Sequence, residues 1–362
     1  MKSGSPQTAT HPGGFTLVEI MVAMVIGMIG IIVMMQVFAT AEAQKRTTTG
    51  TGDAQSSGAL ALYELQGAIR QSGYGFNSTS VLNCALSIPP LPPSTAAARL
   101  VPVFAPTLIN PGGIPAGDAD TDTLLIAYGS SPGSSEGDAI VLANGAALSM
   151  QTPANFAVGD RVIVAPAIET SPCPTLVLDR VNTVAGNVVT IGNSGAKSGE
   201  LLFNLGGSPT IRAYAVRDGN LTACDFVQND CGAPGSVGDP AIWVPIASNI
   251  VGLRAEYGWD TTAGVMDGTV DTWSATRPTA ALPNNNACQW IRAPAVRIAL
   301  LARNSQVDRN ALLPTSQTSV TWAGAAPLLR NETARNNWRN YRYKVFETVV
   351  PIRNLPWMAR CS

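Results

Sequence analysis

The sequence is poor in the residues on which many enzymes depend. It holds a single histidine, His11, close to the N-terminus, so the body of the chain has no histidine triad and no histidine acid–base pair. It contains no P-loop and no nucleophile-elbow motif. Serine, cysteine and carboxylate chemistry stay open in principle, but no motif supports them. We therefore predict that the protein is not an enzyme.

Charge is scarce as well. Only 13% of the residues are charged, and the net charge is −1, which gives no general attraction to nucleic acid or anionic lipid. Residues 330–344 interleave arginines with Trp338, Tyr341 and Tyr343, a pattern that can hold single-stranded nucleic acid. A strand with one buried and one solvated face explains this alternation better. Nucleic acid is thus disfavoured as a partner.

The six cysteines include no CxxC pair, which disfavours a zinc site in a chain with one histidine. An even number of cysteines fits disulfides in an exported domain. The candidates are Cys84, Cys173, Cys224, Cys231, Cys288 and Cys361. Their connectivity is mostly open. The first pairing that we expect is Cys224 with Cys231, because the two close a short loop.

Two groups of aspartates are candidates for cation sites. The first group runs directly into a predicted strand and consists of Asp118, Asp120 and Asp122. It lacks the loop pattern of an EF-hand, so a role in turns is preferred. The second group is a weak calcium candidate and consists of Asp260, Asp267 and Asp271. Spacing alone does not bring these oxygens together, and no cofactor is predicted.

One long apolar run, residues 15–38, lies near the N-terminus, and its distinctly polar members are Thr16, Glu19 and Gln36. As a helix it would rise about 36 Å, enough to cross a hydrocarbon core of about 30 Å. A carboxylate in lipid costs roughly 2.5 kcal/mol or more and calls for a partner. Cleavage before Phe15 would create an ammonium group one helical turn from Glu19, in the same chain or in a neighbouring subunit.

The string GFTLVE at residues 14–19 closely resembles the processing site of type IV prepilins. Members of that family carry a short polar leader ending in glycine, then phenylalanine, then an apolar helix with glutamate at its fifth position. The resemblance implies a prepilin peptidase that cleaves after Gly14 and N-methylates Phe15. It also implies that Glu19 acts in filament assembly.

The rest of the chain predicts an α+β, pilin-like fold. Residues 1–14 are the leader, 15–38 the transmembrane or filament helix, 39–73 its amphipathic continuation, and 74–362 a β-rich, loop-rich domain on which the helix packs. The stripe expected to make this contact is Leu60, Leu62, Tyr63, Leu65 and Ile69. Thr and Gly at 47–52 weaken the helix pattern, and Gly73 ends it.

Residues 77–120 are rich in Pro, Ala and Ser and predict a long irregular connection. Short apolar runs between turn signals then predict strands at 123–128, 139–142, 161–165, 175–181, 187–191, 210–216, 250–257, 295–302 and 343–352. A hairpin is expected around Gly186. We expect these strands to form antiparallel sheet under the long helix.

Three segments of the C-terminal half, 249–260, 296–303 and 341–354, resemble strands of PilW-type minor pilins. The resemblance implies a minor pilin that helps to initiate type IV pilus assembly in a tip or priming complex. The implied partners are other minor pilins, the major pilin, the prepilin peptidase and a PilY-type tip adhesin. The chain would cross the inner membrane once, with its large domain in the periplasm, and then join the pilus.

Other interpretations stay open from the sequence. A J-like pseudopilin of type II secretion shares the helix and the processing logic. A plain membrane anchor would suit an envelope binding or adhesive protein. Small residues at 39–43 also fit cleavage of an ordinary secretory signal, although the apolar run is long for one.

Overall fold

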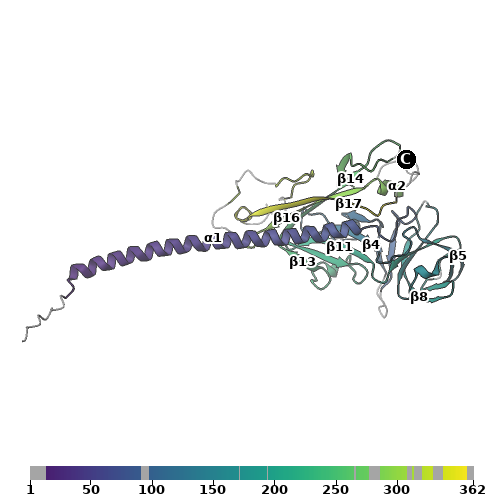
Figure 1. Ribbon diagram of the computed structural model, residues 1–362, viewed down its shortest axis with the longest axis horizontal. Coiled ribbons are helices and arrows are strands. Elements are labelled where there is room, and N and C mark those ends of the chain that lie inside the picture. The colour runs from purple at the N-terminus through teal and green to yellow at the C-terminus, as the bar shows by residue number, and fades with distance from the viewer. Residues whose placement is uncertain are drawn as a thin grey trace, which may run out of the picture. The chain divides into compact units, whose positions relative to one another are not determined.

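The computed structural model describes residues 14–90, 98–170, 172–193, 195–264, 266–276, 286–307, 312–313, 320–328 and 337–356. The chain divides into two compact units, Met1–Gly52 and Asp53–Ser362. The fold is α+β, with a long N-terminal helix followed by a β-rich domain (Figure 1), as the sequence predicts.

Helix α1 spans Leu17–Gln71. It continues through the Thr- and Gly-containing stretch at 47–52 that looked weak in sequence. The hydroxyls of Thr47, Thr48 and Thr51 donate to carbonyl oxygens four residues earlier, at 2.7–3.0 Å. Threonine is tolerated inside the helix here because its hydroxyl bonds back to the preceding turn.

The second unit contains two antiparallel sheets around the end of α1. One has the strand order β13-β12-β11-β4-β3, and the other has the order β15-β14-β16-β17. The first comprises β3 (Thr107–Ile109), β4 (Leu124–Tyr128), β11 (Thr210–Arg217), β12 (Asn220–Asp225) and β13 (Val244–Ser248). The second comprises β14 (Ile250–Trp259), β15 (Thr272–Ser274), β16 (Ala295–Arg303) and β17 (Tyr343–Pro351).

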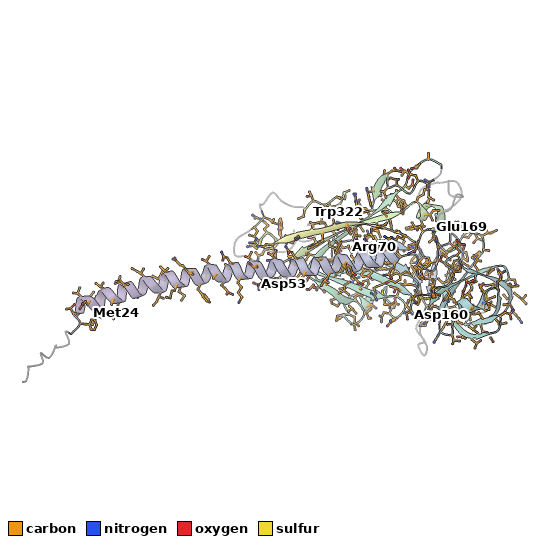
Figure 2. The ribbon with its side chains drawn as sticks, in the orientation of Figure 1. Met24, Asp53, Arg70, Asp160, Glu169 and Trp322 are labelled. Atoms are coloured by element: carbon orange, nitrogen blue, oxygen red, sulfur yellow. A yellow bond between two sulfur atoms is a disulfide. The ribbon has the colours of Figure 1, made fainter. Side chains whose placement is uncertain are left out.

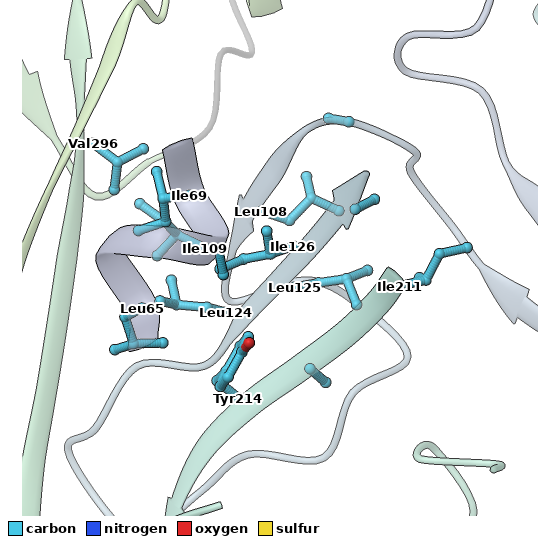
Figure 3. Packing of buried hydrophobic residues seen from close by; sticks show 14 of the residues in the cluster. Leu65, Ile69, Leu108, Ile109, Leu124, Leu125, Ile126, Ile211, Tyr214 and Val296 are labelled. Atoms are coloured by element: carbon cyan, nitrogen blue, oxygen red, sulfur yellow. The ribbon is translucent and has the colours of Figure 1, made fainter. Parts of the chain in front are cut away.

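The last turns of α1 pack between these sheets. Leu65 and Ile69 are fully buried, and Figure 3 shows them between Val296 of β16 on one side and Leu124 of β4 on the other. Their spacing of four residues places them on one helix face. At Gly58 the helix comes so close to Phe346 of β17 that an added Cβ would collide with the ring.

The expected packing stripe was partly wrong. Leu65 and Ile69 are buried and Leu62 is half-buried, but Leu60 and Tyr63 are 64% and 75% exposed. Leu60 lies about 140° around the helix from Leu65. The buried face is instead completed by small residues, Ala54, Gly58, Ala61 and Ala68, which let the helix approach the sheets.

The end of α1 is fixed by two separate parts of the chain. Gly73 has a φ of +83°, the left-handed conformation that glycine adopts after a helix, and its N–H donates to Ala127 O at 2.9 Å. Asn354 Nδ2 donates to the carbonyls of Gln71 and Ser72 at 3.2 and 3.1 Å. The chain following β17 thus supplies hydrogen-bond donors for carbonyl groups at the end of the helix, which have no partner within the helix.

A third sheet has eight strands, and the sequence predicted four of them but not that they form a separate sheet. Its order is β2-β1-β8-β7-β10-β5-β6-β9, with a further pairing of β8 and β9. Its strands are β1 (Leu86–Ile88), β2 (Arg99–Val101), β5 (Asp138–Asn144), β6 (Ala147–Met150), β7 (Arg161–Ala165), β8 (Leu176–Ala185), β9 (Val188–Ile191) and β10 (Leu201–Gly206). Short helical segments are α2 (Asn286–Ile291) and the 3-10 turns Pro153–Asn155, Pro234–Ser236 and Trp338–Asn340.

The extra β8–β9 pairing closes six of these strands into a small barrel, in the order β8-β7-β10-β5-β6-β9. The barrel has its own apolar core, which includes Ile140, Leu148, Val162, Val181 and Leu202. It is inserted between β4 and β11, whose ends pair directly through Tyr128 and Thr210. Its outer face joins the main core, so the barrel is anchored to the rest of the unit.

The region 77–120 is less irregular than predicted, since it contains β1, β2 and β3. All nine predicted strands are present within a few residues of their expected bounds, including the hairpin at Gly186 between β8 and β9. One pairing, β1 with β8, is parallel and departs from the expected antiparallel arrangement.

Candidate functional site

The N-terminal segment Gly14–Glu19 forms the start of α1. Thr16 N donates to Glu19 Oε2 at 3.1 Å, and the Thr16 hydroxyl donates to the same oxygen at 3.1 Å. Glu19 N donates back to Thr16 Oγ1 at 3.3 Å. This reciprocal pattern is a capping box, which satisfies N–H groups that the first helical turn leaves without partners.

The role of Thr16 was missed by the sequence analysis, although a detectable signal exists. A threonine followed three residues later by a glutamate, just before an apolar run, is the pattern of a helix start. The structure therefore gives Glu19 a local partner in the uncleaved chain. The partner expected after cleavage, an α-ammonium group, would arise one residue before Thr16.

Among the described residues, the apolar part of α1 is not covered by any other segment. Every large apolar side chain from Phe15 to Phe38 is exposed, from 46% for Ile20 to 83% for Phe15. Figure 2 shows these side chains, among them Met24, projecting from the helix. By length and composition this helix could cross a membrane. A helix that is apolar all round needs lipid or other apolar helices as its surroundings.

The peptide bond between Gly14 and Phe15 is open to an enzyme. Both residues are exposed and precede the first helical residue, Leu17. A Cβ added at Gly14 would meet no atom within 4 Å. Packing in the described part of the chain therefore does not require a glycine at position 14.

Two sequence families match the chain. Residues 11–35 match the prokaryotic N-terminal methylation motif, and residues 214–354 match the type IV pilus-assembly protein W family, PilW. Both matches support a PilW-type type IV pilin. No curated protein and no solved structure matches it significantly. The two matches support a structural role in a type IV pilus, membrane anchoring and contact with other pilus components.

The PilW match covers β12 to β17 and the end of β11, and leaves the barrel outside. Within it, β14 is a buried inner strand of the second sheet. The hydroxyl of Tyr257 accepts the Ile109 N–H at 2.6 Å, and its ring contacts Trp259 and Trp290. These contacts tie the matched strands to β3 and α2.

A buried ion pair joins β14 to the segment before β4. Arg254 Nη1 lies 3.2 Å from Asp122 Oδ1, and Asp122 also accepts the Ala255 N–H and the Asn110 side-chain amide at 2.9 Å each. Asp118 accepts the N–H groups of Asp218 and Gly219 in the β11–β12 turn. Asp118 therefore holds a turn, whereas Asp122 is buried in an ion pair that the turn interpretation did not include.

The three weak calcium candidates do not converge on a common site. Asp260 accepts the N–H groups of Thr262 and Gly268 at 3.0 and 2.8 Å, Asp271 accepts that of Thr261, and Asp267 that of Thr269. Among the described residues no group of three acidic, cysteine or histidine side chains is arranged to hold a metal. Carboxylates used in this way stiffen turns.

Electrostatics around Asp260 agree with that role. Burial raises the pKa of its carboxyl, but the hydrogen bonds from Gly268 and Thr262, together with the charge of Arg292, outweigh burial and leave the pKa below its ordinary value. Elsewhere in the core, burial raises the pKa of Tyr214 and lowers that of the Arg99 guanidinium.

The basic and aromatic residues near the C-terminus are used inside the fold. Arg339 Nε donates to Leu313 O at 2.8 Å, the Tyr343 hydroxyl donates to Trp338 O at 2.9 Å, and Tyr341 lies under Arg303 at 4.5 Å. Arg335 lies outside the described residues. The contacts of the described residues fit the structural interpretation.

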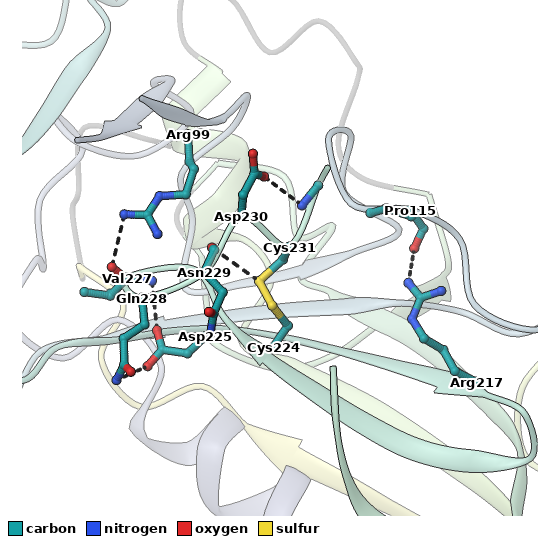
Figure 4. The surroundings of a disulfide bond; sticks show 11 residues. Arg99, Pro115, Arg217, Cys224, Asp225, Val227, Gln228, Asn229, Asp230 and Cys231 are labelled. Atoms are coloured by element: carbon teal, nitrogen blue, oxygen red, sulfur yellow. Dashed lines mark hydrogen bonds between the residues drawn. A yellow bond between two sulfur atoms is a disulfide. The ribbon is translucent and has the colours of Figure 1, made fainter. Parts of the chain in front are cut away.

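Two disulfides occur in the described part of the chain. Cys224 is bonded to Cys231, the pairing expected first, and Figure 4 shows this loop with Arg99 and Asp225 beside it. Cys84 is bonded to Cys173, with Cα atoms 5.3 Å apart, and joins the segment before β1 to the β7–β8 connection. Cys361 lies outside the described residues, as does the side chain of Cys288.

Proposed function

We propose that this chain is a minor pilin that helps to initiate pilus assembly as part of a tip or priming complex. It would be inserted in the inner membrane with its large domain in the periplasm, processed between Gly14 and Phe15, N-methylated at Phe15, and then placed at the pilus tip. Its partners would be other minor pilins, the major pilin, the prepilin peptidase and a PilY-type tip adhesin.

The observation that carries this proposal is the fully exposed apolar surface of α1 beginning directly after Gly14. In the membrane this surface faces lipid, and in a filament it would face the same surface of other subunits. The size of the second unit supports a position at the tip. The barrel inserted between β4 and β11 enlarges the second unit, and an end position leaves room for it.

Glu19 would set the register of the helix within the complex. Before cleavage its carboxylate bonds to Thr16. After cleavage the ammonium of Phe15, in the same or an adjacent subunit, offers a stronger partner in a medium of low dielectric. A subunit in the wrong register would leave a buried charge without a partner, which is strongly unfavourable.

The test is a Glu19→Ala variant expressed in cells that make pili. We expect normal cleavage and at least a tenfold loss from sheared filaments, measured by quantitative mass spectrometry against the major pilin. Glu42→Ala is the matched control, because Glu42 lies on the same helix beyond the apolar run, and it should be incorporated normally. Incorporation of Glu19→Ala at the level of the control would remove Glu19 from the assembly mechanism.

A further inference from the structure

One end of the barrel opens to solvent. Along β7, β8 and β9 alternate side chains face inward, and Val162, Val181 and Val189 belong to the barrel core. The same alternation continues to Val164, Val177 and Ile191, which line a cavity of about 260 Å³ at this end. The loop between β9 and β10 adds Ala196 and Lys197 to the lining. We call this cavity the barrel mouth, defined by these five residues: Val164, Val177, Ile191, Ala196 and Lys197.

The mouth exists because β7 and β8 separate there. Their pairing runs from Arg161–Arg180 to Ile163–Leu178 and stops. Beyond that point β8 pairs with β1 through Leu176 and Val177, on the side away from β7. Among the described residues, no strand occupies the gap between the end of β7 and the start of β8. Their facing backbone edges border the mouth.

Two prolines keep this gap open. Pro166 follows β7, Pro174 precedes β8, and both line the cavity. Proline has no N–H to donate to a ladder, so the β7–β8 pairing does not extend into the connection. The disulfide at Cys173 fixes the chain next to Pro174. The unpaired edges are therefore a built feature of the fold.

The charges at the mouth differ in how they are used. Asp179 accepts the N–H groups of Gly192 and Asn193 at 3.0 and 2.6 Å, and Glu200 accepts the Lys197 N–H at 2.8 Å. These bonds fold the β9–β10 loop over the mouth. The Lys197 side chain is exposed and makes no hydrogen bond or ion pair with the described residues. It is a cation at the edge of a cavity that is lined by apolar side chains and by the hydrogen-bonded carboxylates of Asp179 and Glu200.

We propose that the barrel mouth binds an extended peptide segment of a partner protein. The segment would lie between the separated ends of β7 and β8, where exposed strand edges offer main-chain hydrogen bonds and the cavity accepts one apolar side chain. An acidic residue beside that side chain would pair with Lys197. The inference does not rest on the proposed function, since it concerns the barrel alone.

The probes are two fluorescein-labelled peptides of alternating valine and threonine. One carries a single glutamate beside the central valine, and the other carries lysine in that place. Binding to the full chain in lipid nanodiscs is measured by fluorescence anisotropy. We expect saturable binding of the glutamate peptide below about 1 mM, and binding of the lysine peptide about threefold weaker.

Three variants make the test specific. Ala196→Trp fills the mouth and should weaken binding of the glutamate peptide at least tenfold. Lys197→Glu changes only an exposed side chain and should reverse the preference between the two peptides. Ile168→Ala, at a 77% exposed position on the β7–β8 connection, is the control and should bind as the unmodified chain does. No saturable binding of either peptide, or binding that Ala196→Trp and Lys197→Glu leave unchanged, overturns the proposal.

Discussion

At the scale of single residues, the N-terminal string GFTLVE predicted more than any other part of the chain. Chemistry explains this, because a carboxylate inside an apolar run is costly and therefore marks a specific partner. The same string also holds the capping box of Thr16 and Glu19, which was overlooked. Residues such as Leu60 and Tyr63 were misassigned because apolar character alone does not decide which helix face meets the sheets.

Gly58 gives a prediction at this scale. An added Cβ would collide with the ring of Phe346, so we expect Gly58→Ala to destabilise the second unit by about 1–3 kcal/mol. Urea unfolding in detergent micelles, followed by tryptophan fluorescence, measures the change.

Gly67→Ala is the matched control, because no atom lies within 4 Å of a Cβ at that position. Alanine there should be neutral or stabilise the helix by up to about 1 kcal/mol. Equal effects of the two substitutions would mean that the close approach of α1 to β17 does not matter for stability.

At the scale of elements, the nine strands with clear apolar runs could be predicted from local sequence. The strands that were missed are mostly short, such as β1, β2 and β3 with three residues each, too short to show a period. The barrel could not be predicted for another reason. Its closure depends on β6 pairing with β9 and on β10 pairing with β5 and β7, and long-range pairing leaves no local pattern. The cavity at the barrel mouth could not be predicted for the same reason.

The two disulfides close loops of different length in the sequence, so their removal should lower stability by different amounts. They span sequence separations of 89 residues for Cys84–Cys173 and 7 for Cys224–Cys231. Loop-closure entropy assigns about 4.6 kcal/mol to the longer loop and about 2.5 kcal/mol to the shorter one.

We therefore expect the Cys84→Ala/Cys173→Ala double variant to be the less stable of the two, as measured by urea midpoint at matched conditions. The Cys224→Ala/Cys231→Ala double variant should lose less. The reverse order would show that the bridge beside β1 does not constrain the unfolded chain as the loop length implies.

At the scale of the whole molecule, the two units differ in whether their apolar side chains are exposed or buried. The first presents an apolar helix that is exposed on all sides, and the second has its own core of two sheets, the end of α1 and a barrel. The family matches fall on the two parts that sequence reasoning had singled out, residues 11–35 and 214–354. The barrel lies in the segment between these two ranges and outside both of them.

The most direct test of the central claim is the mass of the N-terminal peptide of the protein isolated from cells that make pili. We predict a chain that begins at Phe15 with one added methyl group, and a Gly14→Ala variant that largely keeps its leader. A mature chain that begins near Ala43, or an intact leader in the unmodified protein, would contradict the account.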